Sequence, residues 1–487
     1  MKPNYVFFHF DSLRANALAC YGNPVVKTPN IDRLASNGVL FERCFSQNPI
    51  CSPSRCSMMT GQYIHGFGHR TLWQLLRPHE PSLMRYLKQA GYRINFYGKN
   101  DLYSQEYLNE ICDNIDELRG GFKTRTPVSG YAGKNPYALT DPRFFSFLFD
   151  PVEETSDTVL LPRMEQKALE FLEDTETDGS PFMLYIPSVM PHPPYSAPKR
   201  YYDMYDQTDV SELITPFSSV SGDVTKIREY REHFKMDTYG DDYPERIYKI
   251  YLGMVSYIDF IVGKFIETLE RKNLIKNTVI IITSDHGDYA GNKGLFEKRG
   301  NSMDDDMLHI PLIIKTPSCV KNKRVNGQVE LFDIMPTIMD LSGVGCGHEH
   351  HAVSLMPHMT GDFDDLNRPV FAEGGYNPRE HEQTLLNNAG DGIGKTSIYY
   401  KHLEFSSRHQ DTNARTVCIR TPEYKLIWRA GDANELYDLS ADKRETINQI
   451  NNPKYIKIKQ ELMERLLQWY ITTSDVPQPG QDSRLFK

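Results

Sequence analysis

The sequence contains no long apolar run. None of its 487 residues belongs to an apolar stretch that could span a bilayer. The first residues, MKPNYVFFHFDSLR, have one lysine and a short apolar stretch that ends at Asp11, without a small-residue cleavage site, so they are not typical of a signal peptide. The chain as it stands is therefore expected to be cytoplasmic and to have no membrane partner. A periplasmic or secreted location is expected only if a leader precedes it.

Cysteine is sparse, and positive charge is not in excess. The eight cysteines are scattered without a Cys-x-x-Cys pair, which argues against a zinc ribbon, a thioredoxin-type site or a disulfide framework. The formal net charge of -9 argues against a broad nucleic-acid-binding surface, so no nucleic-acid partner is expected. A local cationic pocket for a small anion is compatible with this balance.

Strand patterns alternate with helical patterns over the first 370 residues or so. Short apolar runs rich in β-branched and aromatic residues predict buried strands, and apolar positions at helical spacing predict helices. The expected strands are Tyr5–Phe10, Tyr92–Tyr97, Phe182–Pro187, Thr278–Thr283 and Ile310–Lys315. The expected helices are Pro29–Gly38, Pro81–Gly91, Leu161–Asp174, Pro244–Lys272 and Leu331–Leu341. This alternation predicts an α/β fold, with a parallel sheet between two layers of helices.

The pattern changes after about residue 370. Short strands are expected at Ser397–Tyr400, Ala414–Arg420 and Tyr424–Trp428, and a final helix at Tyr455–Tyr470. We therefore predict a catalytic domain over residues 1–370 and a smaller α+β domain over residues 371–487. Two long polar stretches, Tyr201–Tyr243 and Gly374–Thr396, are either rims of a functional site or surface insertions.

Three polar residues follow two of the expected strands. Asp11 comes directly after the first strand, and Asp285 and His286 follow Thr278–Thr283. Because the carboxyl ends of parallel strands meet at one edge of a sheet, these side chains are expected to lie together and to suggest a divalent metal. Taken singly, an aspartate after a strand is more often a helix cap or a turn residue.

The segment Cys51–Gly61, CSPSRCSMMTG, is the strongest local feature. It predicts the start of a helix, with Pro53 in the first turn. A helix N-terminus favours an anion, and Arg55 lies one turn along on the same side as Cys51. This setting implies an acidified or modified cysteine facing an anionic ligand. The three residues between Cys51 and Arg55 are too few for the phosphate loop of cysteine phosphatases, and a purely structural cysteine is the other alternative.

Cys51–Gly61 also matches the sulfatase signature, Cys/Ser-x-Pro-x-Arg ending in Thr-Gly, at every fixed position. Further segments resemble the remaining blocks of that family in order: Tyr92–Lys99, Pro191–Pro194, Ser284–Gly287 with Lys298, Asp333–Gly343, and Arg420–Ile427 with Glu435–Asp438. The chain thus resembles the sulfatase family over nearly its whole length. The resemblance implies an alkaline-phosphatase-like fold, with a large, mostly parallel α/β domain and a smaller C-terminal domain that has an antiparallel sheet.

The resemblance also implies the chemistry. Cys51 is expected to be oxidised to formylglycine by a formylglycine-generating or anaerobic sulfatase-maturating enzyme. One hydroxyl of the hydrated aldehyde attacks sulfur and the other helps to expel sulfate, whereas a plain cysteine or serine would stay trapped as an adduct. The metal, expected on Asp11, Cys51, Asp285 and His286, lowers the pKa of the attacking hydroxyl. The remaining catalytic residues are Arg55, which steadies the nucleophile, and Lys99, His192 and Lys298, which surround the sulfate.

Three positions depart from the family pattern. Ser12 stands where many sulfatases have a second aspartate, and His286 where many have asparagine. The family implies Ca²⁺, but an imidazole ligand suits Mn²⁺ or Zn²⁺ and resembles the phosphonate monoester hydrolase branch. Asp101 stands where a histidine is common and is a candidate substrate contact; either it replaces that histidine as the base that helps to expel sulfate, or that role lies elsewhere. Either His192 or Asp285 is expected to protonate the leaving oxygen.

The expected function is hydrolysis of a sulfate ester. The default substrate is a sulfated carbohydrate, either a small molecule or an oligosaccharide. One alternative is a phosphonate monoester or phosphodiester hydrolase with the same formylglycine. Another is a binding protein that kept the fold without catalysis. His65, His69 and Arg70 are candidate substrate contacts at the rim.

Overall fold

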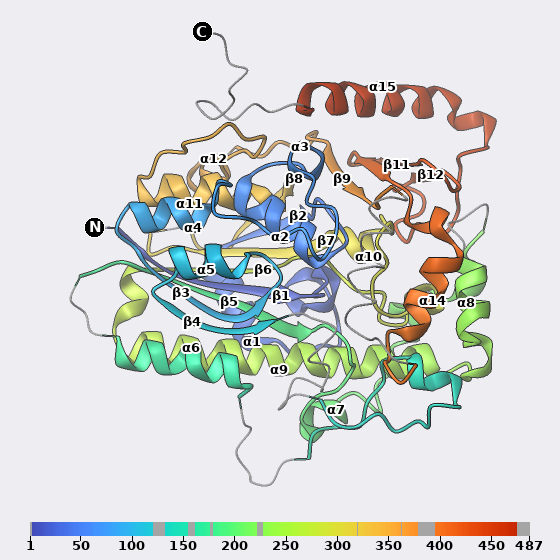
Figure 1. Cartoon of the computed structure of the whole chain (residues 1–487), viewed down its shortest axis with the longest axis horizontal. Helices are drawn as coiled ribbons and strands as arrows, with labels where there is room; N and C mark the ends of the chain where they lie inside the picture. The colour runs from blue at the N-terminus through green and yellow to red at the C-terminus, as the bar shows by residue number, and fades with distance from the viewer. Residues whose placement is uncertain are drawn as a thin grey trace.

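Two β-sheets organise the molecule, which is described here as a computed structural model of the whole chain (Figure 1). The structure describes residues 2–119, 132–153, 161–175, 179–221, 227–318, 320–361, 363–377 and 395–474. The larger sheet has eight strands in the order β4-β3-β5-β1-β6-β7-β2-β8, and the smaller has four in the order β12-β11-β10-β9.

The larger sheet is mixed but mostly parallel. Its strands are β1 (Asn4–Asp11), β2 (Val39–Phe45), β3 (Arg93–Asn100), β4 (Asn114–Arg119), β5 (Phe182–Pro191), β6 (Thr278–Ser284), β7 (His309–Lys315) and β8 (Lys323–Glu330). Strand β7 runs antiparallel to both of its neighbours, β6 and β2, and the other pairs in this sheet are parallel. The expected strands of this region are all present, and the α/β fold class is confirmed. With β7 as the single antiparallel strand of this sheet among the described residues, the expectation of a mostly parallel sheet is confirmed.

Helices cover both faces of this sheet, and alternation along β1 separates the two cores. Val6, Phe8 and Phe10 pack into the core beneath α9, whereas Tyr5 and Phe7 pack into the opposite core. One face carries α1 (Pro29–Ser36), α6 (Arg163–Asp174), α7 (Lys199–Tyr202) and α9 (Tyr243–Arg271). The other carries α2 (Cys51–Thr60), α4 (Leu83–Gln89), α5 (Gln105–Ile111), α11 (Ile334–Ser342) and α12 (Met356–Thr360).

The smaller sheet is antiparallel and is covered by the last helix. Its strands are β9 (Val370–Gly374), β10 (Thr416–Arg420), β11 (Tyr424–Arg429) and β12 (Glu435–Asp438). Helix α15 (Ile456–Thr473) packs Leu462, Leu466 and Trp469 into a core shared with Ile419 and Leu426 of the strands. The expected antiparallel sheet and final helix are thereby confirmed.

One expected strand of this region was wrong. Residues 397–399 form turns, and Tyr400 begins helix α14 (Tyr400–Arg408), because a short apolar run does not by itself distinguish a strand from a helix start. The polar stretch Tyr201–Tyr243 contains helix α8 (Ile227–Phe234). Most of the stretch Gly374–Thr396 lies outside the described residues.

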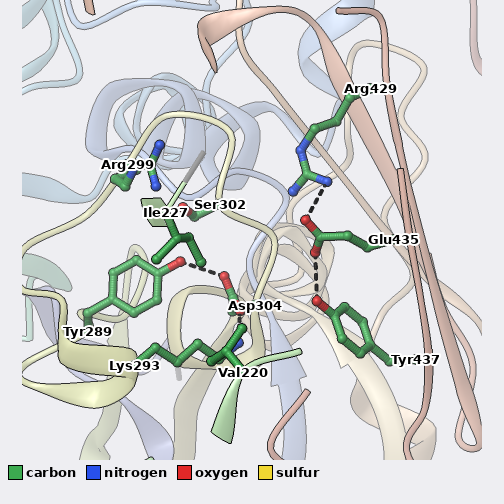
Figure 2. Close-up of a pocket in the computed structure, with 10 residues that line it drawn as sticks. All are labelled: Val220, Ile227, Tyr289, Lys293, Arg299, Ser302, Asp304, Arg429, Glu435 and Tyr437. Atoms are coloured by element: carbon green, nitrogen blue, oxygen red, sulfur yellow. Dashed lines mark hydrogen bonds and ion pairs between the residues drawn. The ribbon is translucent and has the colours of Figure 1, made fainter. Parts of the chain in front are cut away.

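Buried ion pairs join the smaller sheet to the loops of the larger one. Asp305, which begins helix α10 (Asp305–Leu308), accepts hydrogen bonds from Arg420 at 2.9 Å and from Lys425 at 2.5 Å. Figure 2 shows a pocket at this junction, where Glu435 binds the side chains of two neighbours in the small sheet. These ion pairs hold the two sheets close together. The division of the chain into two domains at residue 370 stays a prediction. No helix among the described residues is long and apolar enough to cross a membrane.

Candidate active site

The carboxyl ends of β1 and β6 meet the first residue of α2. The two strands pair in parallel, with Phe10 opposite Ser284, so Asp11 and Asp285 lie side by side. Helix α2 begins at Cys51, as the sequence predicted, and directs that residue towards them. Asp11, Asp285 and His286 are fully buried, and Cys51 is 1% exposed.

Asp11, Cys51, Asp285 and His286 form a compact group of ligand atoms. One atom from each lies within 4.8 Å of the others, and Cys51 Sγ is 3.2 Å from His286 Nε2. His286 donates its Nδ1–H to the carbonyl of Gly287, which leaves the Nε2 lone pair facing the group. Burial lowers the pKa of His286, so the ring is neutral and able to bind a metal. The donor set therefore fits a divalent cation with mixed oxygen, nitrogen and residue-51 ligands.

Arg55 is completely buried and connects the two carboxylates. Its Nε donates to Asp285 Oδ2 at 3.0 Å, and its NH2 donates to Asp11 Oδ2 at 3.0 Å. A further hydrogen bond reaches the carbonyl of Lys99. The sequence placed Arg55 on the side of Cys51, but its side-chain hydrogen bonds to carboxylates reach Asp11 and Asp285, so it fixes the position of these two side chains.

The thiol of Cys51 is not acidified by this setting. Burial, and then the charge of Asp11, raise the pKa of the Cys51 thiol well above its ordinary value. An unmodified Cys51 is therefore a neutral thiol and a weak nucleophile. Of the two alternatives from the sequence, this result favours a modified side chain over an acidified one.

Lys99 places a positive charge beside Cys51. Its Nζ lies 2.6 Å from Asp11 Oδ2, 3.6 Å from Cys51 Sγ and 2.8 Å from Asp101 Oδ2. Burial lowers the pKa of Lys99, but Asp101 and Asp11 outweigh it and hold the pKa well above its ordinary value. Lys99 is therefore a permanent cation, and Asp101 is its second partner.

Lys298 and His192 form a second group near Cys51. The Lys298 ammonium donates to His192 Nε2 at 2.7 Å and to Glu297 Oε1 at 2.9 Å. His192 Nδ1 donates to the carbonyl of Pro193, so Nε2 is the acceptor. Burial and then Lys298 hold the pKa of His192 well below its ordinary value. Burial also lowers the pKa of Lys298, but Cys51 and Glu297 outweigh it, so the proton of this pair resides on the lysine.

Sequence reasoning missed two residues that contact this site. Ser12 donates its Oγ–H to Asp11 Oδ1 and its backbone N–H to Asp285 Oδ1, each at 3.2 Å, and adopts a left-handed φ of 72°. Glu297 contacts Lys298 and lies 3.8 Å from His192 Nε2. The sequence offered one signal for each residue: Ser12 directly follows Asp11, and Glu297 directly precedes Lys298.

The three candidate rim residues bind internal partners. His65 Nδ1 lies 2.7 Å from Glu373 Oε1, and Arg70 donates to Glu373 Oε2 at 2.9 Å. His69 lies between the carbonyl of Gln74 and the carboxylate of Glu80. A substrate-binding role for His65, His69 and Arg70 stays a prediction.

The charges of the site are nearly balanced. Four carboxylates, on Asp11, Asp101, Asp285 and Glu297, face three cations, on Arg55, Lys99 and Lys298, which leaves one net negative charge. A divalent cation would change this to one net positive charge. That charge complements an ester group with a single negative charge.

The fold is of the alkaline-phosphatase-like type, and a group of four residues that could hold a metal lies at the edge of its larger sheet. A solved phosphonate monoester hydrolase of Agrobacterium radiobacter has the same fold, with a TM-score of 0.71, 20% identity, and coverage of 97% of this chain and 96% of that one. A protein solved in complex with its substrate D-glucosamine-2-N,6-O-disulfate gives a TM-score of 0.68 at 20% identity, covering 99% of this chain and all of that one. At these identities the likeness shows the fold alone.

The sequence comparisons identify the family. The family model described as Sulfatase matches residues 3–344, and the model for the C-terminal part of N-sulphoglucosamine sulphohydrolase matches residues 379–471. The chain therefore belongs to the sulfatase family and is a sulfuric ester hydrolase. An N-acetylglucosamine-6-O-sulfatase of Bacteroides thetaiotaomicron is 25% identical over 546 residues, which cover all of this chain and 89% of that protein.

Proposed function

We propose that this sulfatase hydrolyses a carbohydrate sulfate ester with formylglycine formed at Cys51 and a divalent cation held by Asp11, residue 51, Asp285 and His286. The observation that carries the proposal is the buried four-residue group at the start of α2. The B. thetaiotaomicron relative, named for a sulfated amino sugar, supports a carbohydrate substrate.

The roles of the side chains follow from their contacts. The hydrated aldehyde at residue 51 would supply the nucleophilic hydroxyl. The cation, when bound, would lower the pKa of that hydroxyl. Arg55 pairs with the two aspartates and so shares the neutralisation of their charge with the cation. Lys99 and Lys298 bind the oxygens of the sulfate from two sides and offset the charge that develops as the S–O bond breaks.

Proton transfer to the leaving oxygen is assigned to the Lys298–His192 pair. Asp285 is ionised and has no proton to donate because, although burial and Asp11 raise its pKa, His286 and Arg55 hold it below its ordinary value. His192 is neutral and accepts its hydrogen bond from Lys298. The proton that is available near the sulfate is therefore on Lys298 Nζ, and His192 orients it.

The identity of the cation is tested by reconstitution. The nitrogen donor of His286 favours Mn²⁺ or Zn²⁺, whereas the family implies Ca²⁺. Protein stripped with EDTA is reloaded with each ion in turn. Binding is measured by calorimetry, beside the metal content of the protein as purified. Equal, weak binding of all three ions would contradict a specific metal-binding site at these four residues.

The function is tested on protein co-expressed with a formylglycine-generating or anaerobic sulfatase-maturating enzyme. Mass spectrometry of the Cys51 peptide is expected to show the aldehyde. Turnover of 4-nitrophenyl sulfate and of glucosamine 6-sulfate is expected to be lost in Cys51→Ala. The second candidate, a phosphonate monoester hydrolase, is favoured only by His286. Much faster turnover of an aryl phosphonate monoester by the aldehyde-bearing protein would reject the first proposal in favour of the second.

A further inference from the structure

Glu297 is a buried acidic residue whose backbone is held in an unusual conformation. It is 5% exposed and has a φ of 60°, in the left-handed region that non-glycine residues adopt only at a free-energy cost. Such a conformation persists only where the surroundings enforce it. Here the backbone N–H of Glu297 donates to the Tyr195 hydroxyl at 2.8 Å.

The same tyrosine ties Glu297 to the segment that carries His192. Tyr195 lies three residues after His192, and its hydroxyl donates to Asp288 Oδ1 at 2.6 Å. Asp288 is fully buried in the loop after β6. One chain of hydrogen bonds therefore fixes the backbone on both sides of the Lys298–His192 contact.

The carboxylate of Glu297 completes the surroundings of the Lys298 ammonium. An ammonium has three N–H donors in total. One N–H of Lys298 points to His192 Nε2 and another to Glu297 Oε1, at 2.7 and 2.9 Å. Because the N–H bonds of an ammonium have a fixed tetrahedral arrangement, these two hydrogen bonds also fix the direction of the third N–H. Without the carboxylate, the buried cation would keep a direct hydrogen bond only to a neutral ring, and its charge would be offset only by the more distant Asp11, against the like charge of Lys99.

We propose that Glu297 is a positioning residue for proton transfer to the leaving group, which keeps Lys298 charged and aims its free N–H at the leaving oxygen. The inference rests on the proposed function and adds a residue to it. As a hydroxyl oxygen of the hydrated aldehyde at residue 51 bonds to sulfur and its proton passes to solvent, the S–O bond to the leaving group breaks. The electron pair of that bond passes to the leaving oxygen, which takes a proton from Lys298 Nζ. The neutral amine then regains a proton from water.

The test compares sulfate esters whose leaving groups differ in their need for a proton. The aldehyde-bearing, metal-loaded enzyme and its Glu297→Gln variant are assayed on 4-nitrophenyl sulfate, on phenyl sulfates with less acidic phenols, and on glucosamine 6-sulfate. Nitrophenolate leaves without protonation, so its kcat is expected to change by less than about threefold. The kcat for the sugar is expected to fall about 100-fold, within the range of general acid catalysis, with little change in KM.

Two further variants protect the interpretation. Glu297→Gly removes the carboxylate and tolerates a φ of 60° without strain, so it is expected to fold and to show the same selective loss. Glu435→Gln is the matched control. Glu435 is also a buried glutamate, bonded to Arg429 at 2.9 Å and to Tyr437 at 2.8 Å (Figure 2), and its substitution is expected to leave the leaving-group dependence unchanged.

The outcomes separate the inference from the function on which it rests. A uniform loss for all leaving groups in both Glu297 variants, or no loss in either, would overturn the inference while the function stands. A wild-type protein with a confirmed aldehyde that hydrolyses none of the sulfate esters would overturn both.

Discussion

Replacing Arg55 with methionine tests whether Arg55 and a cation neutralise the same two carboxylates. The guanidinium is 0% exposed and binds Asp11 and Asp285, which are equally buried. Removing one partner of a buried ion pair costs about 3–5 kcal/mol, because the other charge stays buried and uncompensated. Lys99 still faces Asp11 in the variant. We therefore expect the loss in the free energy of unfolding to lie near the lower end of this range, about 3 kcal/mol, in metal-free protein. A bound divalent cation supplies the missing charge, and the loss should then shrink to about 1 kcal/mol or less.

The measurement is urea unfolding of Arg55→Met and wild-type protein in EDTA and in excess divalent cation. By linkage, a metal-dependent difference of about 2–3 kcal/mol corresponds to metal binding tighter by about 30- to 150-fold in the variant. Arg429→Met is the control, since Arg429 is 2% exposed and pairs with Glu435 rather than with a metal-binding residue. Its loss should be the same with and without metal. An equal loss for Arg55→Met in both conditions would refute the shared-carboxylate reasoning.

Three further predictions concern neighbouring groups. Burial raises the pKa of Asp288 to about 7, above its unfolded value of 3.8, so its stabilising contribution is present below about pH 4 and is lost as the pH rises through 7. In urea unfolding, the free energy of unfolding of Asp288→Asn relative to wild type should therefore rise by about 2 kcal/mol between pH 5 and pH 8. A difference between variant and wild type that does not change with pH would contradict this. Ser12→Gly keeps the left-handed φ but loses the hydroxyl bonded to Asp11, so metal titration should show binding weaker by about tenfold, whereas unchanged affinity would exclude an orienting role. Lys99→Met should lower kcat/KM for 4-nitrophenyl sulfate by about 10²- to 10³-fold while metal binding tightens, and an unchanged rate would remove Lys99 from sulfate binding.

The parts of the fold that sequence reasoning predicted are those buried on both faces. Strands β1 and β6 read as apolar runs, interrupted only by His9 in β1, so their ends, and hence Asp11, Asp285 and His286, could be placed together from the sequence. Strand β8 was not recognised because it lies at the sheet edge and reads KRVNGQVE, with Arg324 and Asn326 exposed. An edge strand needs no apolar pattern on its open side.

The contacts that escaped prediction depend on distant partners or on local backbone conformation. Glu373, the partner of His65 and Arg70, lies more than 300 residues away from them in the sequence, so no local pattern distinguishes an internal ion pair from a rim contact. Glu297 reaches the Lys298 ammonium from a left-handed backbone that glutamate rarely adopts. Residue type at these positions indicates charge, and only the folded chain shows which charge it meets.

The balance of charge restricts the ester that this site accepts. Asp101 and Glu297 each neutralise one of the two lysines nearest Cys51, and Ser12 contributes a hydroxyl where many relatives have a second carboxylate. With a divalent cation the site carries one net positive charge, which a sulfate monoester or a phosphonate monoester, each with one negative charge, balances. A phosphate monoester has a second negative charge at neutral pH, which would face Asp101 and Glu297 without a further cation to offset it. We therefore expect the site to discriminate against phosphate monoesters electrostatically, through the same two carboxylates that pair with Lys99 and Lys298.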